Sequence, residues 1–217
     1  MLTSTRALHV SAIPAAATAP QLADLPEGEF LLVTTGGGGD GDGLIDWVLG
    51  AYEHDPGGLP PVVLNFGPFM LPDHQAAFAA RAARLPKVRT ITFDARLESL
   101  MARAAGVVAM GGYNTFCEIL SFDKPALIVP RTTPRLEQYI RARRASELGL
   151  VAILPDTDGR EPRTMAAALL QLAQQAPPST VVIPGLLDGM ASVDRLARKW
   201  LARGRAEGLR VRTGRNA

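Results

Sequence analysis

The feature that most constrains the fold is an alternation of short apolar runs with longer helical patterns from residue 30 onward. The short runs, rich in β-branched and aliphatic residues, predict strands at 30–35, 61–66, 88–93, 106–110, 126–129 and 150–154. Helical spacing is found at 43–53, 73–85, 97–104, 115–121, 135–148, 163–175 and 189–203. Such alternation is typical of a parallel sheet with helices on both faces. The sequence therefore predicts an α/β fold with a Rossmann-like, doubly wound, six-stranded parallel sheet.

The domain boundaries are read from changes in this pattern. Residues 1–29 contain prolines and many alanines with little periodicity, so we expect a leader or linker there. We expect the folded domain over 30–185, followed by a C-terminal helix and basic tail over 186–217. The helical stretch 135–148 is expected to be amphipathic, with its apolar side formed by Leu136, Ile140 and Leu148.

Composition narrows the class of protein. The chain has 217 residues and 47% hydrophobic content, which is ample for a globular core. Its single cysteine, Cys117, allows no intramolecular disulfide and favours a cytoplasmic location. No uninterrupted apolar run approaches the roughly 20 residues that span a bilayer. The three histidines, which are dispersed, lack the spacing of metal ligands, so we expect no metal site.

The C-terminal segment is basic although the formal net charge is only +2. Its basic residues are Arg195, Arg198, Lys199, Arg203, Arg205, Arg210, Arg212 and Arg215. Such a tail could contact nucleic acid or an anionic membrane surface, or it could be a solvated helix face with a frayed end. We expect no nucleic-acid partner, and peripheral membrane contact through this tail stays a hypothesis.

A first glycine-rich loop follows the first predicted strand and consists of Gly36, Gly37, Gly38 and Gly39. With the two residues that follow, it formally matches the dinucleotide-binding pattern G-x-G-x-x-G. That pattern also needs an acidic residue at the end of the second strand, where Asn65-Phe66-Gly67 supplies none. The glycines would let the backbone approach a ligand closely, or they form a plain flexible turn.

A second glycine turn lies between the fourth predicted strand and the next helix. It comprises Gly111, Gly112, Tyr113, Asn114 and Thr115. Free backbone N–H groups and a helix N-terminus at the carboxyl end of a strand stabilise an anionic phosphate. The sequence therefore indicates a phosphate-binding site in this turn.

Three polar side chains follow these strands, and each has two interpretations. The carboxylate of Glu118 could accept both hydroxyls of a ribose, or Thr115 to Glu118 could form a capping box that serves only the helix end. Glu137 and Gln138 suit sugar hydroxyls on the same rim of the sheet, or they form an ordinary exposed first turn of a helix.

A group of arginines lies around the helix after the fifth predicted strand. Most of them are expected to face solvent, with one or two able to approach a diphosphate; they are Arg131, Arg135, Arg141, Arg143 and Arg144.

Together these residues resemble the C-terminal, donor-binding half of GT-B glycosyltransferases of the MurG type, in glycosyltransferase family 28. The resemblance covers about 30–154 and is strongest over 88–148. It implies that the turn from Gly111 to Thr115 holds the donor diphosphate and that Glu118 binds the ribose. It further implies uracil recognition by Thr92 and Phe93, contact of Glu137 and Gln138 with the transferred sugar, and a family glycine loop at Gly36 to Gly39.

The resemblance implies a donor domain for a nucleotide diphosphate sugar, with a UDP-sugar expected and no further cofactor. The turn Gly111-Gly112-Tyr113 departs from the Ser-Gly-Ala turn common in MurG-like proteins. The acceptor-binding half, which supplies the catalytic base, is not in this sequence, so transfer would need an acceptor domain or a partner polypeptide. No catalytic residue is assigned. A UDP-sugar hydrolase, a non-catalytic nucleotide-sugar-binding subunit and, last, an NAD-linked oxidoreductase remain alternatives.

Overall fold

The computed structural model describes residues 25–37, 39–92, 97–156 and 159–213, and for 203–213 only the course of the backbone. The chain divides into two compact units, with the boundary between Val181 and Val182. The first unit contains the sheet, and the second contains the long helix α7, Gly189–Thr213.

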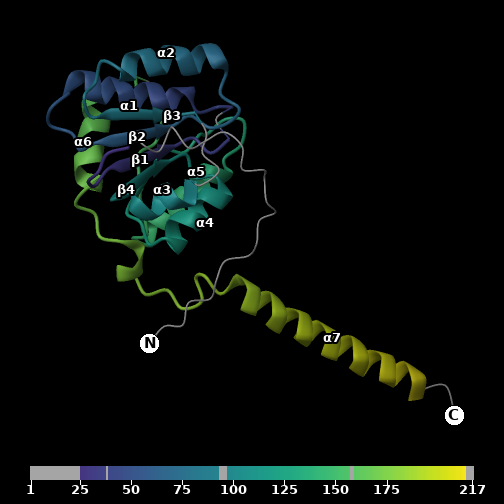
Figure 1. Cartoon of the computed structure of the whole chain (residues 1–217). Coiled ribbons are helices and arrows are strands. Elements are labelled where there is room, and N and C mark those ends of the chain that lie inside the picture. Colours follow the sequence, from purple (N-terminus) through teal and green to yellow (C-terminus); the bar gives the residue numbers. More distant parts are fainter. Residues whose placement is uncertain (1–24, 38, 93–96, 157–158, 214–217) are drawn as a thin grey trace. The chain divides into compact units, whose positions relative to one another are not determined.

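In the described residues of the first unit, six parallel strands form one sheet (Figure 1). They are β1 (Leu31–Thr34), β2 (Val62–Asn65), β3 (Val88–Ile91), β4 (Gly106–Ala109), β5 (Ala126–Ile128) and β6 (Ala152–Ile153). Their order across the sheet is β3-β2-β1-β4-β5-β6, and each neighbouring pair is parallel. The predicted doubly wound, six-stranded sheet is confirmed.

Helices cover both faces of the sheet. Those that connect successive strands are α1 (Asp42–His54), α2 (Pro72–Ala82), α3 (Leu97–Arg103), α4 (Tyr113–Ser121) and α5 (Glu137–Glu147), and α6 (Pro162–Leu172) follows the last strand. In Figure 1, α1 and α2 lie on one face and α3, α4 and α5 on the other. The connection after β1 runs to one face of the sheet and the connection after its neighbour β4 to the opposite face, so the order of the strands reverses between them.

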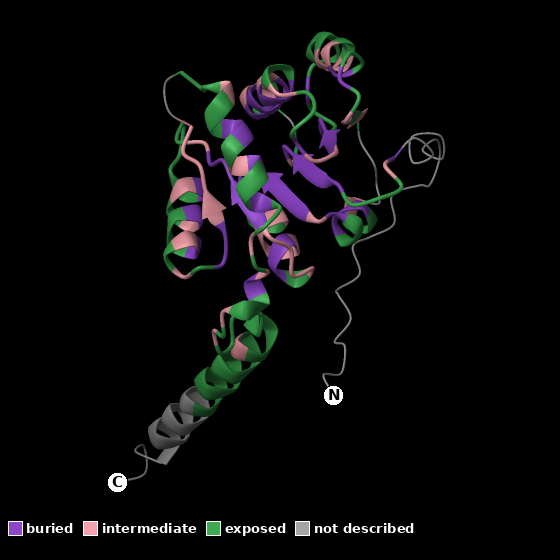
Figure 2. Cartoon of the chain, turned by 90° about the vertical axis from the view of Figure 1, so that its left-hand side faces the viewer, coloured by how far each residue is buried: buried purple, intermediate pink, exposed green. Residues whose placement is uncertain are grey.

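The core lies on both faces of the sheet, and the central strands are buried along their whole length (Figure 2). Leu31 and Val33 belong to a large apolar cluster with residues of α1 and α6, whereas Leu32, equally buried, lies outside that cluster. Successive side chains of a strand point to opposite faces, so a strand buried on both faces has a continuous apolar sequence.

The helix α5 corrects one prediction. Its buried side consists of Gln138, Ala142 and Ala145, while Leu136 and Ile140 are 52% and 62% exposed. The predicted apolar side was therefore wrong. Alanine side chains are small enough to let α5 pack closely against its neighbours, and this leaves the larger apolar side chains on the outer side.

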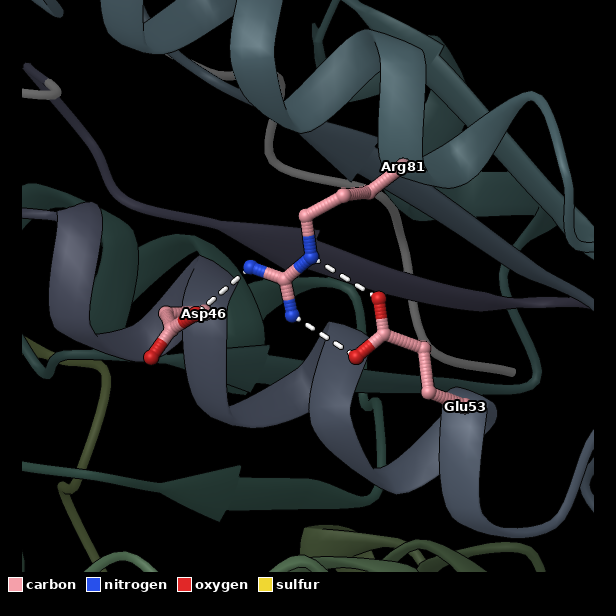
Figure 3. Close-up of polar contacts among 3 residues, drawn as sticks. All are labelled: Asp46, Glu53 and Arg81. Carbon is pink, nitrogen blue, oxygen red and sulfur yellow. Dashed lines mark hydrogen bonds and ion pairs between the residues drawn. The ribbon is translucent and has the colours of Figure 1, made fainter.

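An ion-pair cluster joins α2 to α1 on the surface (Figure 3). The guanidinium of Arg81 donates hydrogen bonds of 2.8 and 2.9 Å to the carboxylate of Glu53 and one of 2.6 Å to Asp46. The two acids are seven residues apart, which places them on one side of α1 two turns apart. The hydrogen bond to Glu53 is the largest factor that raises the pKa of Arg81 above its usual range.

Within the described residues, no helix is both long enough and apolar enough to cross a membrane.

Candidate functional site

The candidate site lies where the two adjacent central strands, β1 and β4, send their connections to opposite faces of the sheet. In open α/β sheets, this switch point opens a crevice beyond the carboxyl ends of the strands, and ligands bind in it. A pocket with a volume of about 490 Å³ is found here. It is lined by Thr34, Thr35, Gly36, Gly37, Asp40, Leu97, Met110, Gly111, Gly112, Tyr113, Asn114, Thr115, Glu118, Arg131 and Gln138. This volume is typical of small-molecule sites.

The loop after β1 forms one wall of the pocket. The backbone N–H of Gly36 donates a hydrogen bond of 3.3 Å to Oγ1 of Thr34, which also accepts one of 3.4 Å from Nδ2 of Asn65. The carbonyl of Gly37 accepts a hydrogen bond of 2.8 Å from the Phe69 N–H. Of the predicted glycine loop, Gly36 and Gly37 line the pocket, Gly39 does not, and Gly38 lies outside the described residues.

The turn after β4 forms the opposite wall, and Gly111 gives it its shape. The φ angle of Gly111 is +80°, and a Cβ at this position would lie 2.8 Å from Cγ2 of Ile128. Both the backbone conformation and the space therefore require glycine. Across the pocket, a Cβ on Gly36 would lie 3.9 Å from Oγ1 of Thr115, so the two loops approach each other closely.

The N-terminus of α4 lies in this second wall. The helix begins at Tyr113, with Gly112 as the N-cap residue and no side-chain hydrogen bond at the cap. The first intrahelical bond is donated by the Phe116 N–H to the Gly112 carbonyl at 2.9 Å. Helix geometry leaves the N–H groups of Tyr113, Asn114 and Thr115 without intrahelical partners, and the peptide dipoles make this end electropositive.

The capping-box interpretation of Glu118 is wrong. Thr115 is the third residue of α4 rather than its N-cap, because the helix starts two residues before the predicted position. Glu118 lies further along the helix, is half-buried and lines the pocket. Burial raises the pKa of its carboxyl group, and the nearby carboxylate of Glu98 raises that pKa further. A half-buried carboxylate in the pocket is available to accept hydrogen bonds from a ligand.

Arg141 holds the second glycine turn in place. Its guanidinium donates a hydrogen bond of 2.6 Å to the carbonyl oxygen of Gly111. It also lies over the ring of Tyr113, 5.5 Å from the ring centroid. Tyr113 is 67% exposed, so the bulk that distinguishes this turn from Ser-Gly-Ala lies largely in solvent and against Arg141.

The loop between β5 and α5 closes a third side of the pocket. Gln138 is buried and lines the pocket, and its Oε1 accepts a hydrogen bond of 3.4 Å from the Arg131 N–H. Glu137 is exposed and does not line the pocket, but its carboxylate lies 3.5 Å from the guanidinium of Arg131. The interpretation of this pair as an ordinary exposed first turn therefore fits Glu137 and not Gln138.

Of the two residues expected to bind the base, Thr92 is described by the structure and is not brought to this pocket. Thr92 is exposed directly after β3 and does not line it, and Phe93 lies outside the described residues. Leu97, the first residue of α3, lines the pocket from this side instead.

Sequence reasoning also missed Thr34, Thr35 and the structural role of Arg141. The two threonines end the apolar run of β1 at the rim of the sheet, a position that could have identified them.

The comparisons with known proteins bear on this fold. The model of the glycosyltransferase family 28 C-terminal domain matches residues 32–180. Among curated protein sequences, none matches this chain.

Three solved structures illustrate the structural likeness. The calicheamicin glycosyltransferase CalG4 is 23% identical with a TM-score of 0.53, over 69% of this chain and 36% of its own. MurG of Acinetobacter baumannii is 18% identical with a TM-score of 0.55, over 70% and 43%. The glycosyltransferase VinC, in complex with dTDP, is 22% identical with a TM-score of 0.50, over 85% and 45%. This chain thus spans less than half the length of each structure. Because the family model matches more than half of the chain, the protein belongs to the glycosyltransferase family 28 C-terminal domain family.

Proposed function

We propose that this protein is the donor-binding domain of a glycosyltransferase and that its pocket binds a nucleotide diphosphate sugar. Among these ligands, a UDP-sugar is the first candidate. Transfer would then require an acceptor-binding domain or a partner polypeptide. The family assignment supports the general class of reaction. One structural neighbour, VinC, is described in complex with dTDP, so a thymidine nucleotide belongs among the ligands to test.

The observation that carries the proposal is the N-terminus of α4 in the wall of a pocket at the switch point of the sheet. In this arrangement the diphosphate would accept hydrogen bonds from the free N–H groups of Tyr113, Asn114 and Thr115. These donors are fixed before the ligand binds, so they would also stabilise the charge that develops on the diphosphate as the sugar leaves.

The other polar groups of the pocket suit the remaining parts of such a ligand. The carboxylate of Glu118 would accept hydrogen bonds from the ribose hydroxyls. Gln138 is buried beside the same pocket and would contact the sugar, with Glu137 further out. The proposal assigns no catalytic base, and recognition of the base by Thr92 and Phe93 stays a prediction.

Two alternatives differ in what happens to the ligand. A UDP-sugar hydrolase would use the same pocket with water as the acceptor. A non-catalytic subunit would bind the ligand and release no UDP. Product analysis after incubation with UDP-sugars separates these alternatives, because only the hydrolase yields free sugar and UDP without an acceptor.

Calorimetric titration against UDP, GDP and dTDP and their sugar conjugates tests the proposal. We expect saturable binding of at least one nucleoside diphosphate. We also expect weaker binding of the corresponding nucleoside, since the diphosphate contacts supply much of the affinity. The absence of binding to any of these ligands, in protein shown to be folded by circular dichroism, would overturn the proposal.

We also propose that the protein acts in the cytoplasm. The single cysteine, which allows no intramolecular disulfide, supports this compartment.

We further propose that α7 contacts an anionic membrane surface. Met190, Val193, Leu196 and Trp200, spaced three or four residues apart, are all more than half exposed. Arg195, Arg198 and Lys199 occupy other sides of the helix. A basic helix with an exposed apolar stripe is typical of binding in the plane of an anionic lipid surface.

Sedimentation with vesicles tests this membrane contact. We expect the full chain to pellet with vesicles that contain phosphatidylglycerol and to stay in the supernatant with phosphatidylcholine alone. Trp200→Ala should reduce the pelleted fraction at least threefold. A wild-type protein that stays in the supernatant with both kinds of vesicle would contradict the proposal.

A further inference from the structure

Arg131 joins the first glycine loop to the loop between β5 and α5. Nη1 of Arg131 donates a hydrogen bond to Oδ2 of Asp40, which lies 91 residues earlier in the chain. The carboxylate of Glu137 lies 3.5 Å from Nη2 of the same guanidinium. Nε of Arg131 is buried and has no hydrogen-bond partner among the described residues. The buried Nε–H is therefore an unused donor of the guanidinium, whose charge is shared by two carboxylates.

Asp40 and Arg131 also separate two cavities. Both line the main pocket, and both line a second cavity of about 180 Å³ beside it, together with Trp47 and Thr133. The ion pair thus lies at the junction of the two cavities and lines the same pocket as the N-terminus of α4. It is partly buried, with 32% of the Arg131 side chain and 45% of the Asp40 side chain exposed.

A diphosphate in this pocket needs more positive charge than the helix supplies. The N-terminus of a helix is equivalent to about half an elementary charge. In the described part of the chain, no three His, Cys, Asp or Glu side chains gather in a way that could hold a metal ion. The compensating charge must then be sought among the arginines, whose planar fork of donors fits phosphate oxygens.

Of the arginines near the pocket, Arg131 has the position and the unused donor for this role. Arg141 is engaged with the carbonyl oxygen of Gly111. Arg143 and Arg144 are largely exposed and pair with Glu147 on the outer side of α5. Arg135 is exposed and does not line the pocket.

We propose that Arg131 binds the diphosphate of the donor and that Asp40 occupies its guanidinium until the nucleotide arrives. When the nucleotide binds, the guanidinium of Arg131 exchanges the Asp40 carboxylate for the phosphate oxygens. The loss of the Asp40 contact therefore lowers the net affinity for the ligand. Asp40 is then a competitor of the ligand, although it lies in the binding pocket. This inference rests on the proposed function, because it concerns the diphosphate of the same ligand.

The exchange predicts opposite effects for the two residues. Arg131→Gln should weaken binding of UDP at least tenfold, because it removes the charge and the donors. Asp40→Asn should strengthen binding of UDP about threefold or more, because the amide competes for the guanidinium less well than a carboxylate. If Asp40 served to hold Arg131 in its binding position, Asp40→Asn would weaken binding instead.

The experiment is a calorimetric titration of UDP and of uridine into the wild type, Arg131→Gln, Arg131→Lys, Asp40→Asn and the double variant. Arg135→Gln is the matched control, since it removes the same charge from the same loop outside the pocket. Circular dichroism verifies folding, and Arg131→Lys covers the case in which Arg131→Gln fails to fold. We expect Arg131→Lys to fall between the wild type and Arg131→Gln, because it retains the charge and loses the planar fork.

The double variant separates exchange from simple repulsion between Asp40 and phosphate. If Asp40 acts through Arg131, the gain from Asp40→Asn disappears in the Arg131→Gln background. A gain that persists there overturns the exchange, as does equal UDP affinity in the wild type and Arg131→Gln. Failure of the wild type to bind any nucleoside diphosphate would instead contradict the proposed function itself.

Discussion

The guanidinium of Arg141 donates a hydrogen bond of 2.6 Å to the carbonyl oxygen of Gly111, across thirty residues of sequence. This contact ties α5 to the turn between β4 and α4. A carbonyl engaged by Arg141 is fixed in orientation, and this fixes the peptide groups that follow at the N-terminus of α4. The proposed anion-binding donors therefore depend on a side chain from the next helix along the chain.

Removal of this contact should affect both folding and ligand binding. We expect Arg141→Gln to lower the free energy of unfolding by about 1 to 2 kcal/mol, because a hydrogen bond from a charged donor is lost. UDP affinity should fall at least fivefold as the turn relaxes. Chemical denaturation and calorimetry measure the two effects. Arg144→Gln, on the exposed side of α5, is the control and should leave UDP affinity unchanged.

The two glycines of this turn should respond differently to alanine. Gly111→Ala forces a residue with a Cβ into a positive φ and brings that Cβ within 2.8 Å of Ile128, so we expect a loss of about 2 kcal/mol of stability. Thermal or chemical unfolding measures this loss. Equal stability of Gly111→Ala and the wild type would contradict the described turn.

Gly112→Ala tests close approach of a ligand. Gly112 has an ordinary φ of −54°, and a Cβ there meets nothing within 4 Å. Its stability should change by about 0.5 kcal/mol at most, since the preference for glycine at the helix start and the lower entropy of an unfolded alanine oppose each other. The added methyl group would nevertheless occupy space in the pocket, so UDP should bind less tightly. Unchanged affinity would place the diphosphate elsewhere.

Glu118→Gln should separate stability from binding. Burial raises the pKa of Glu118, so at a pH above this pKa the charged carboxylate destabilises the folded protein. Glutamine removes the cost, so at pH 7 the variant should be as stable as the wild type or slightly more stable. UDP affinity should fall, because the charged acceptor for the ribose is lost. A variant that loses stability and keeps its affinity would assign Glu118 a structural role.

The same pKa shift predicts a pH dependence. Between the ordinary pKa of 4.5 and the raised value, the folded state binds more protons at Glu118 than the unfolded state does. The contribution of Glu118 to stability therefore decreases as the pH rises through this window. UDP affinity should change in the opposite sense, falling as the carboxylate is protonated, and it should start to fall at a higher pH than for an ordinary glutamate. Glu118→Gln should lose this component of both pH profiles.

The ion-pair cluster of Figure 3 should contribute to stability alone. Arg81 joins α1 to α2 away from the pocket, and its partners Asp46 and Glu53 are about half exposed. Because solvent screens such pairs, Arg81→Gln should cost about 1 kcal/mol, with a smaller cost at 1 M salt. UDP affinity should not change. A tenfold loss of affinity would show that the packing of α1 and α2 controls the site.

Much of the fold was predictable because strands of a parallel sheet are buried on both faces. The runs around Val33 and Val108 are apolar throughout, and each predicted strand contains the observed one. Sequence could not predict which side of α5 is buried. The buried side depends on how closely the helix approaches its neighbours and not on hydrophobicity alone. Alanine side chains allow a close approach, whereas the larger side chain of Ile140 does not.

The candidate site was predictable as a region and less so as a set of contacts. The glycine turns at the ends of two strands predicted the two walls of the pocket. Glycine at such a place indicates a backbone conformation or a close approach that residues with a Cβ do not allow. The start of α4 was missed since no Ser, Thr, Asp or Asn caps it, and Gly112 has that role. The contacts of Arg131 with Asp40 and of Arg141 with Gly111 join segments 91 and 30 residues apart, and no local pattern reveals such pairs.

Diphosphate binding at the N-terminus of α4 is tested most sharply by a titration of ¹⁵N-labelled protein with UDP, followed through the backbone amide resonances. We expect the largest shifts at Gly112, Tyr113, Asn114 and Thr115, saturating together and weakening as the salt concentration rises. Uridine should shift these four amides much less than UDP does. Shifts confined to other parts of the chain, or equal shifts of these amides with uridine and UDP, would contradict a diphosphate bound at the N-terminus of α4.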